Sequence, residues 1–189
     1  MDMASISIPQ SPGGLRPLRK NGDSIHVYGG RAAICFELGL SPERAPAIHL
    51  QAAARDARNY DWDNKIQVML KQDEAIEMLG CLIGAIPATQ GRYHGASKNK
   101  GYSLSAEGSA FTASVSAGGA GCHAVSISRA QAVLIAGMVL RYLCRMEPEL
   151  TQSDWVQLVR LILPPSTPVD PDSAGNDGSI AAAFPSRRA

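Results

Sequence analysis

Apolar and polar residues alternate along much of the chain between residues 24 and 128, as they do in half-buried β-strands. In the segment 65–71 (KIQVMLK), Ile66, Val68 and Leu70 share an apolar face. Later segments repeat the alternation with serine and threonine on their polar side. The pattern predicts strands at residues 24–29, 31–39, 45–56, 65–71, 91–96, 101–108, 110–117 and 122–128.

Two helical patterns interrupt the strands. The first begins near Asp73, where acidic residues favour the positive end of the helix dipole. The second begins with a capping box formed by Ser128 and Gln131, and it is apolar on nearly every side as far as Leu143. Because such a helix must be buried on several faces, we expect it to form a subunit interface as well as part of the core.

A third, shorter helix is predicted within residues 148–164. Ser153 is its expected N-cap, and Trp155 begins an apolar face that continues through Leu158, Val159 and Ile162. The proline pair that starts at Pro164 ends it. We interpret this segment as a packing or partner-binding helix.

The strands and helices form an internal repeat. Residues 65–86 match residues 122–143, which lie 57 positions further on, and both copies are a strand that enters a helix directly. Chance similarity of two apolar strand–helix junctions is the alternative. The same order of elements precedes each copy and favours a true repeat. The predicted fold class is therefore α+β, with two antiparallel four-stranded sheets that are each followed by a helix (ββββα, twice).

Length and composition limit the possible domain organisation of the chain. A length of 189 residues with 45% apolar residues suits one domain, which we place at residues 23–147. Residues 1–22 and 165–189 are rich in proline, serine and glycine and are predicted to be disordered tails. The sequence has neither a run of about 18 apolar residues nor a signal-peptide pattern, so we expect a cytoplasmic protein with no membrane partner.

Four cysteines are widely spaced within apolar runs, which favours buried, reduced thiols. The four histidines show no spacing typical of a metal site, so no metal and no cofactor are predicted. Motifs such as G-x-S-x-G, the P-loop and H-E-x-x-H are missing from the sequence. We therefore expect neither an enzyme nor a small-molecule substrate.

Charge is unevenly distributed, although the net charge is only +1. From Asn21 to Glu77 acidic residues outnumber basic ones by three, whereas from Met78 to Met146 basic residues outnumber acidic ones by five. The second half of the domain is therefore the part that would attract a polyanion.

The segment 91–102 combines the two residue types that single-strand binders use, which are cations for phosphates and aromatic rings for bases. It contains no acidic residue, and its glycines would let it follow a phosphate backbone. A weaker copy around Trp62 is diluted by Asp61 and Asp63. The candidate contact residues are Arg92, Tyr93, Lys98, Lys100 and Tyr102 in the first segment, and Arg58, Trp62 and Lys65 in the second. The competing interpretation is a solvated turn.

Two strand-rich units that each end in a helix resemble the Whirly fold of plant Whirly proteins and of the guide-RNA-binding proteins of kinetoplastid mitochondria. The resemblance covers about Ser24 to Met146 and rests on element order. It implies two sheets that radiate from a helical hub, tetramers assembled through the helices, and single strands that lie across the sheet edges without strong sequence preference. The Lys-Gly-Lys signature of the plant family is absent, and Lys98-Asn99-Lys100-Gly101 is similar to it.

The sequence thus predicts a homotetramer that binds single-stranded DNA or RNA passively, in replication, recombination or maintenance. The alternative is an oligomeric scaffold or protein-interaction module with no affinity for nucleic acid. The near-neutral net charge and the acidic first half favour that alternative.

Overall fold

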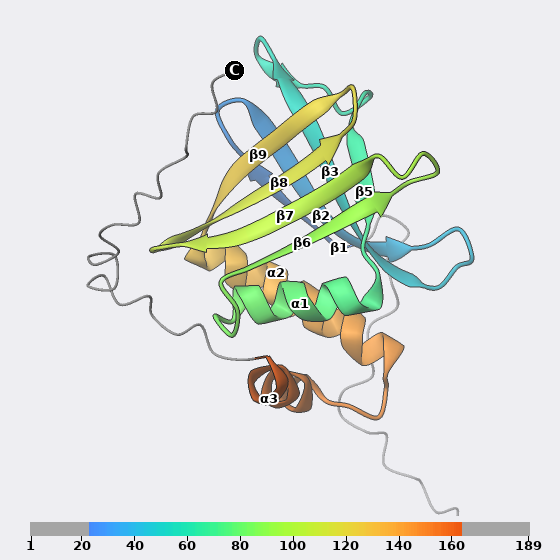
Figure 1. Cartoon of the computed structure of the whole chain (residues 1–189), viewed down its shortest axis with the longest axis vertical. Coiled ribbons are helices and arrows are strands. Elements are labelled where there is room, and N and C mark those ends of the chain that lie inside the picture. The colour runs from blue at the N-terminus through green and yellow to red at the C-terminus, as the bar shows by residue number, and fades with distance from the viewer. Residues whose placement is uncertain (1–22, 164–189) are drawn as a thin grey trace, which may run out of the picture.

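The computed structural model describes residues 23–163, which form two antiparallel sheets and three helices (Figure 1). Residues 1–22 and 164–189 lie outside the described residues, and so do both predicted tails and the last position predicted for the C-terminal helix. Each sheet is followed by a helix, so the predicted order of four main strands and a helix, repeated twice, is confirmed.

The first sheet is built around its longest strand. Its elements in chain order are β1 (Asp23–Tyr28), β2 (Ala32–Leu40), β3 (Pro46–Asp56), the two-residue β4 (Asn59–Tyr60) and β5 (Ile66–Met69). β1, β2 and β3 are neighbours in that order, and both β4 and β5 pair with β3. The four longer strands match the prediction. The short β4 was not predicted, and it forms a tight hairpin with the end of β3.

The second sheet is a meander of four strands, β6 (Ala88–His94), β7 (Lys100–Glu107), β8 (Ala110–Ala117) and β9 (Gly121–Ser128), in that order across the sheet. Short turns join them, as an antiparallel arrangement allows. All four were predicted, and the edges of this sheet are β6 and β9.

The core lies between the inward faces of the two sheets and the helices beneath them (Figure 1). Alternate strand residues such as Ile34, Phe36, Leu104 and Val115 are almost completely buried, as the period of two requires. Helices α1 (Gln72–Leu82) and α2 (Arg129–Met146) close the lower end of this core, and Met138 from α2 is fully buried in it.

Helix ends follow local side-chain chemistry. Ser128 caps α2 and accepts a hydrogen bond from the Gln131 amide, as predicted. The predicted N-cap of α3 (Gln152–Ile162) was wrong, because Thr151 caps this helix and its partner in the capping box is Asp154. The predicted apolar face of α3 is also only partly correct, since Trp155 and Val159 are buried but Ile162 is exposed.

No helix among residues 23–163 combines the length and the apolarity needed to cross a bilayer. The prediction of four buried cysteines was wrong in one case. Cys35, Cys81 and Cys144 are buried, but Cys122 is exposed near the start of β9, because the residues with odd numbers, such as Val125, occupy the inward face of that strand.

We expect a maleimide at about pH 8 to modify Cys122 rapidly and the other thiols only after unfolding. Burial raises the pKa of Cys35 and of Cys81 to about 11, so few of these thiols are in the reactive thiolate form. Mass spectrometry of labelled protein, with and without denaturant, checks this, and Cys122→Ser is the matched control. Rapid labelling of a second cysteine in the folded protein would contradict the packing described here.

Candidate nucleic-acid interface

The edge strand β6 contains a β-bulge that places two consecutive side chains in solvent. Its register against β7 shifts between Gly91 and His94, and both Arg92 and Tyr93 are exposed. Tyr93 has a positive φ of 64°, and 75% of its surface is exposed. Because such a backbone conformation costs a bulky residue about 1–3 kcal/mol, the rest of the hairpin must hold it in place.

Buried polar contacts hold the bulge against the first helix. His94 Nε2 lies 2.9 Å from Glu74 Oε1, and the other carboxylate oxygen of Glu74 accepts the Lys71 amide at 2.9 Å. Both His94 and Glu74 are largely buried. Gly91 lies beside them, where a Cβ atom would collide with the ring of Tyr102 as well as with Glu74. The bulge therefore fits only around a residue without a side chain.

The start of β7, just after the bulge and the turn, reaches across to the first sheet. Lys100 Nζ donates a hydrogen bond of 3.3 Å to the backbone oxygen of Gln67 in β5. β5 pairs only with β3 among the described strands, and this hydrogen bond places its other edge beside the β6–β7 hairpin. The edges of the two sheets are thus joined at this point.

A groove of about 510 Å³ lies where these two edges meet. We call it the β5–β6 groove. It combines the open ring of Tyr93, the apolar Met69 and the ammonium groups of Lys71 and Lys100. Its lining residues are Pro42, His49, Gln67, Met69, Lys71, Tyr93, His94, Gly95 and Lys100. An aromatic face beside cations and an apolar floor can accept a base and neutralise phosphates.

Hydrogen bonds fix the wall of the groove that the first sheet provides. His49 Nε2 donates to the Leu40 carbonyl at 3.2 Å, and His49 Nδ1 accepts from the amide of Gln67 at 3.1 Å. With the Gln67 amide nitrogen as the donor, these contacts match the tautomer that has its proton on Nε2. The wall is therefore polar and ordered.

Several predicted site residues lie in or beside this groove. Tyr93 and Lys100 line it, and Arg92 is exposed next to Tyr93 on the bulge, where it donates to Gln90 at 3.2 Å. Lys98 is exposed in the turn that precedes β7 and has a positive φ of 50°. These four residues are brought together by one hairpin.

The prediction that Tyr102 stacks on a base was wrong. Only 3% of its surface is exposed, because it faces inward on β7 with Leu104 and its ring fills the space that Gly91 leaves on the neighbouring strand. Burial raises the pKa of its hydroxyl far above the usual value, so the phenol stays neutral. The alternation of apolar residues in 102–106 already indicated an inward position.

The other predicted segment lies apart from the groove. Arg58 is exposed in the turn between β3 and β4, and Figure 1 shows the tip of this hairpin separate from the β6–β7 tip. Trp62 is half-buried with its ring centroid 5.3 Å from that of His26. Lys65 is exposed just before β5, on the same face as Gln67. None of the three lines the groove.

Sequence reasoning missed several groove residues, namely Pro42, His49, Met69 and Lys71. The signal for two of them was present. Lys71 belongs to the polar face of the 65–71 segment, and Met69 alternates onto the same face. Pro42 and His49 come from the β2–β3 hairpin, and only the folding of that hairpin beside β5 brings them to the groove.

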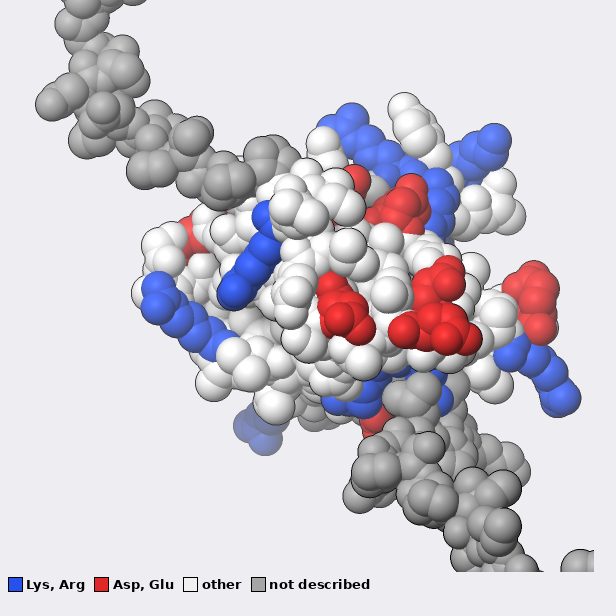
Figure 2. All heavy atoms as spheres, turned by 90° about the horizontal axis from the view of Figure 1, so that it is seen from below, with Lys and Arg blue, Asp and Glu red and all other residues white. Residues whose placement is uncertain are grey.

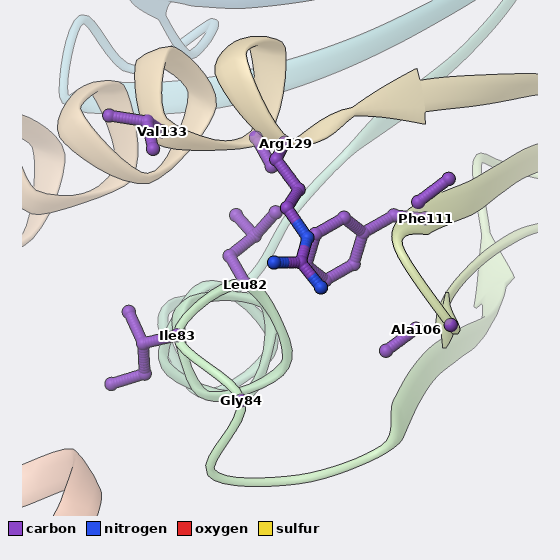
Figure 3. A pocket seen from close by; sticks show the side chains of 10 residues that line it. Leu82, Ile83, Gly84, Ala106, Phe111, Arg129 and Val133 are labelled. Carbon is purple, nitrogen blue, oxygen red and sulfur yellow. The ribbon is translucent and has the colours of Figure 1, made fainter.

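A second cavity, of about 370 Å³, lies where α1 ends and α2 begins (Figure 3). Its side chains are mainly apolar and include Leu82, Ile83, Phe111 and Val133. Arg129 is its one cation, and Nε of this residue donates to the Ser109 carbonyl at 3.2 Å. An apolar cavity with a single cation suits an apolar protein surface better than a chain of phosphates.

The helix side of the molecule, seen in Figure 2, is mostly uncharged and carries acidic groups across its middle. Exposed acidic residues on this side of the fold include Asp73 and Glu77 of α1. A polyanion would be repelled here, whereas the segment 91–102 around the β6–β7 turn carries three cations and no acid. Within residues 23–163, no group of three or more His, Cys, Asp or Glu side chains is placed to hold a metal ion.

Several solved structures match the chain. The plant transcriptional regulator PBF-2 is 18% identical over 75% of this chain and 96% of its own, with a TM-score of 0.49. WHY3 from Arabidopsis thaliana is 16% identical over 74% of this chain and 94% of its own, with a TM-score of 0.46. A chain of the Trypanosoma brucei MRP1/MRP2 structures is 10% identical over 66% of this chain and 86% of its own, with a TM-score of 0.48.

PBF-2 and WHY3 are plant Whirly proteins, the group that the order of elements in the sequence resembles. At these identities the likeness concerns the fold and does not extend to contact residues. No model of a known protein family matches the chain, and no curated protein matches it in sequence.

We expect Gly91→Ala to lower the free energy of unfolding by about 1–3 kcal/mol, because the new methyl group overlaps the Tyr102 ring and the Glu74 carboxylate. Gly30→Ala is the matched control, since no atom lies within 4 Å of its added Cβ, and we expect a change within about 0.5 kcal/mol. Urea unfolding followed by circular dichroism measures both. Equal stabilities of the two variants would contradict the close packing behind the bulge.

Proposed function

We propose that this protein binds single-stranded nucleic acid in the β5–β6 groove, with a base on Tyr93 and phosphates on Lys71 and Lys100. The observation that carries the proposal is the Tyr93 ring, which a strained bulge holds 75% exposed beside two lysines. A ring that served only to fill the core would be buried, as Tyr102 is.

The chemistry of the groove supports single strands over duplexes. A base must be unpaired to lie on an aromatic face, whereas a duplex offers mainly its phosphates and groove edges. Duplex binding by charge alone needs a broad basic surface, and a net charge of +1 with an acidic helix side does not provide one. Stacking on Tyr93 distinguishes little between bases, so weak sequence preference follows.

The proposed binding is passive. Both imidazoles of the groove have structural partners, since His94 meets Glu74 and His49 bonds to Leu40 and Gln67. Neither is therefore set up to move a proton to or from a ligand. A cytoplasmic protein that holds an exposed strand, of DNA or of RNA, would serve replication, recombination or maintenance.

We further propose that two or more copies assemble through α2, with a homotetramer as the expected state. Val133 and Leu134 on this helix are 71% and 60% exposed, although both are aliphatic. Val133 also borders the apolar cavity between α1 and α2 (Figure 3). A second copy of the chain would cover these side chains and fill that cavity in a self-complementary contact.

The same observation favours a second candidate function, which is an oligomeric scaffold without affinity for nucleic acid. The apolar cavity and the exposed face of α2 need only another protein chain to explain them. The acidic balance of the first half of the domain agrees with this candidate. Binding measurements separate the two candidates.

We expect fluorescent oligo-dT to bind more tightly than a duplex of the same length. Tyr93→Ala should weaken binding by about 5- to 150-fold, which corresponds to the loss of about 1–3 kcal/mol of stacking, with little change in salt dependence. Lys71→Ala with Lys100→Ala should instead reduce the slope of log affinity against log salt by about 1.4. Fluorescence anisotropy at several salt concentrations, with single-stranded RNA in parallel, measures each variant.

Arg160→Ala is the control for these variants, because it removes an exposed cation from α3 on the other side of the fold. Its affinity should equal that of the unmodified protein. If the unmodified protein binds no oligonucleotide even at low salt, the nucleic-acid proposal is wrong and the scaffold remains. Equal binding of duplex and single strand, unaffected by Tyr93→Ala, would also overturn it.

We expect Val133→Asp with Leu134→Asp to convert the assembled protein to monomers without unfolding it, since both side chains are exposed in the single chain. Leu40→Asp is the control, as it charges a leucine at the end of β2 that is 50% exposed. Light scattering coupled to gel filtration gives the mass, and circular dichroism confirms folding. An unmodified protein that is already monomeric would rule out assembly through α2.

A further inference from the structure

Four aromatic side chains gather on the outward face of the first sheet, away from the β5–β6 groove. His26 and Tyr28 come from β1, Tyr60 from β4 and Trp62 from the segment before β5. The ring centroids of His26 and Trp62 are 5.3 Å apart, those of Tyr28 and Tyr60 are 5.3 Å apart, and those of His26 and Tyr28 are 5.9 Å apart. We call these four residues the ring cluster.

The strand alternation explains why the cluster faces outward. Val27 points into the core and is 1% exposed, so its neighbours His26 and Tyr28 point out. Tyr28 is in register with Ala33, which is in register with Ala53, and these two outward alanines are nonetheless fully buried. Small side chains on the strands thus leave room for large rings above them.

Local contacts hold part of the cluster rigidly. The hydroxyl of Tyr60 donates a hydrogen bond of 2.8 Å to the Gly29 carbonyl, which ties β4 to the end of β1. Tyr60 and Trp62 are half-buried and so have a structural role as covers of the sheet. Tyr28 is different, because 59% of its surface stays exposed and its ring adds little to that cover.

The sheet connects the ring cluster to the β5–β6 groove. Outward residues of four strands are in register from His26 through Cys35 and Gln51 to Gln67, which lines the groove. Three spacings between neighbouring strands amount to about 14 Å, the length of about four stacked nucleotides. One single strand can therefore reach from the groove to the rings.

Charges along this path indicate where bases and where phosphates of a nucleic acid would bind. Glu37 lies on the same face and accepts a hydrogen bond from Gln51, and two aspartates flank Trp62. Phosphates are therefore disfavoured at the rings themselves. Lys65, exposed on the same face of the chain as Gln67, supplies a cation between the two sites. The rings suit bases, and the lysine suits the backbone that joins them.

We propose that the ring cluster is a second base-stacking platform, with Tyr28 as its open ring, for the same single strand that the β5–β6 groove holds. This inference rests on the proposed function. Binding at two linked platforms raises affinity through effective concentration only when one oligonucleotide is long enough to reach both. Affinity should therefore increase steeply with the length of the oligonucleotide. This increase should disappear when the Tyr28 ring is removed.

The test titrates oligo-dT from ~4 to ~16 nucleotides, which spans the site sizes of known single-strand binders. Tyr28→Ala should bind the shortest oligonucleotides as the unmodified protein does and the longest about 5- to 150-fold more weakly. Tyr28→Phe keeps the ring and should behave as the unmodified protein at every length. Tyr93→Ala should weaken binding at all lengths.

A second measurement needs no change to the cluster. Trp155 is buried in α3, so a Trp155→Phe background leaves Trp62 as the sole tryptophan, next to the proposed platform. Long oligonucleotides should quench its fluorescence and the shortest should not. Since this readout leaves Tyr28 in place, it holds even if Tyr28→Ala proves unstable.

The outcomes distinguish the two proposals. If the unmodified protein binds and Tyr93→Ala weakens it, but Tyr28→Ala matches the unmodified protein at every length and Trp62 emission is unchanged, the ring cluster is only a cover for the sheet. The groove would stand in that case. If the unmodified protein binds no oligonucleotide, both proposals fail together.

Discussion

Burial of the inward faces of two antiparallel sheets against each other is the interaction on which the rest of this structure depends. Each strand has one apolar face, and neither sheet can hide that face alone. Stacking the sheets buries both, and α1 and α2 then close the end where the sheets separate (Figure 1). Most polar side chains of the strands are consequently turned outward. The groove and the ring cluster both belong to this outward set, so their positions follow from how the core is packed.

An open sheet has edge strands that need protection from unwanted pairing. The features that protect two such edges here also form the candidate interface. Within residues 23–163, β5 pairs with a strand on one side only and β6 is an edge strand, so both present backbone groups that have no strand partner. The bulge in β6 interrupts its edge, and Lys100 uses a free carbonyl of β5. Features that prevent unwanted strand pairing thereby place a ring and cations in the same groove. The buried contact between His94 and Glu74 links this edge to α1, so the geometry of the groove is supported by the core behind it.

Tyr93 and Tyr102 show what a sequence pattern can and cannot predict. Both lie in one basic, glycine-rich segment, and composition alone treats them as equal candidates for stacking on a base. Alternation separates Tyr102, which belongs to the apolar face of β7, and the structure buries it. The local pattern does not predict the bulge that exposes Tyr93. The bulge forms because residues of α1 and β7 leave room at position 91 for glycine alone. His26 and Tyr28 were missed for a similar reason, since their ring partners come from a segment more than 30 positions away.

The sequence by itself determined the eight main strands, the two long helices, the order ββββα repeated twice and the Ser128 capping box. These features depend on periodicity and on interactions between residues a few positions apart, which a linear pattern records. Only the tertiary structure decided which residues share a surface. Pro42, the pair Met69 and Lys71, and Tyr93 come from three separate segments, and the packing of one sheet edge against another brings them to one groove. Distances of that kind are set by the whole core, so no short stretch of sequence contains them.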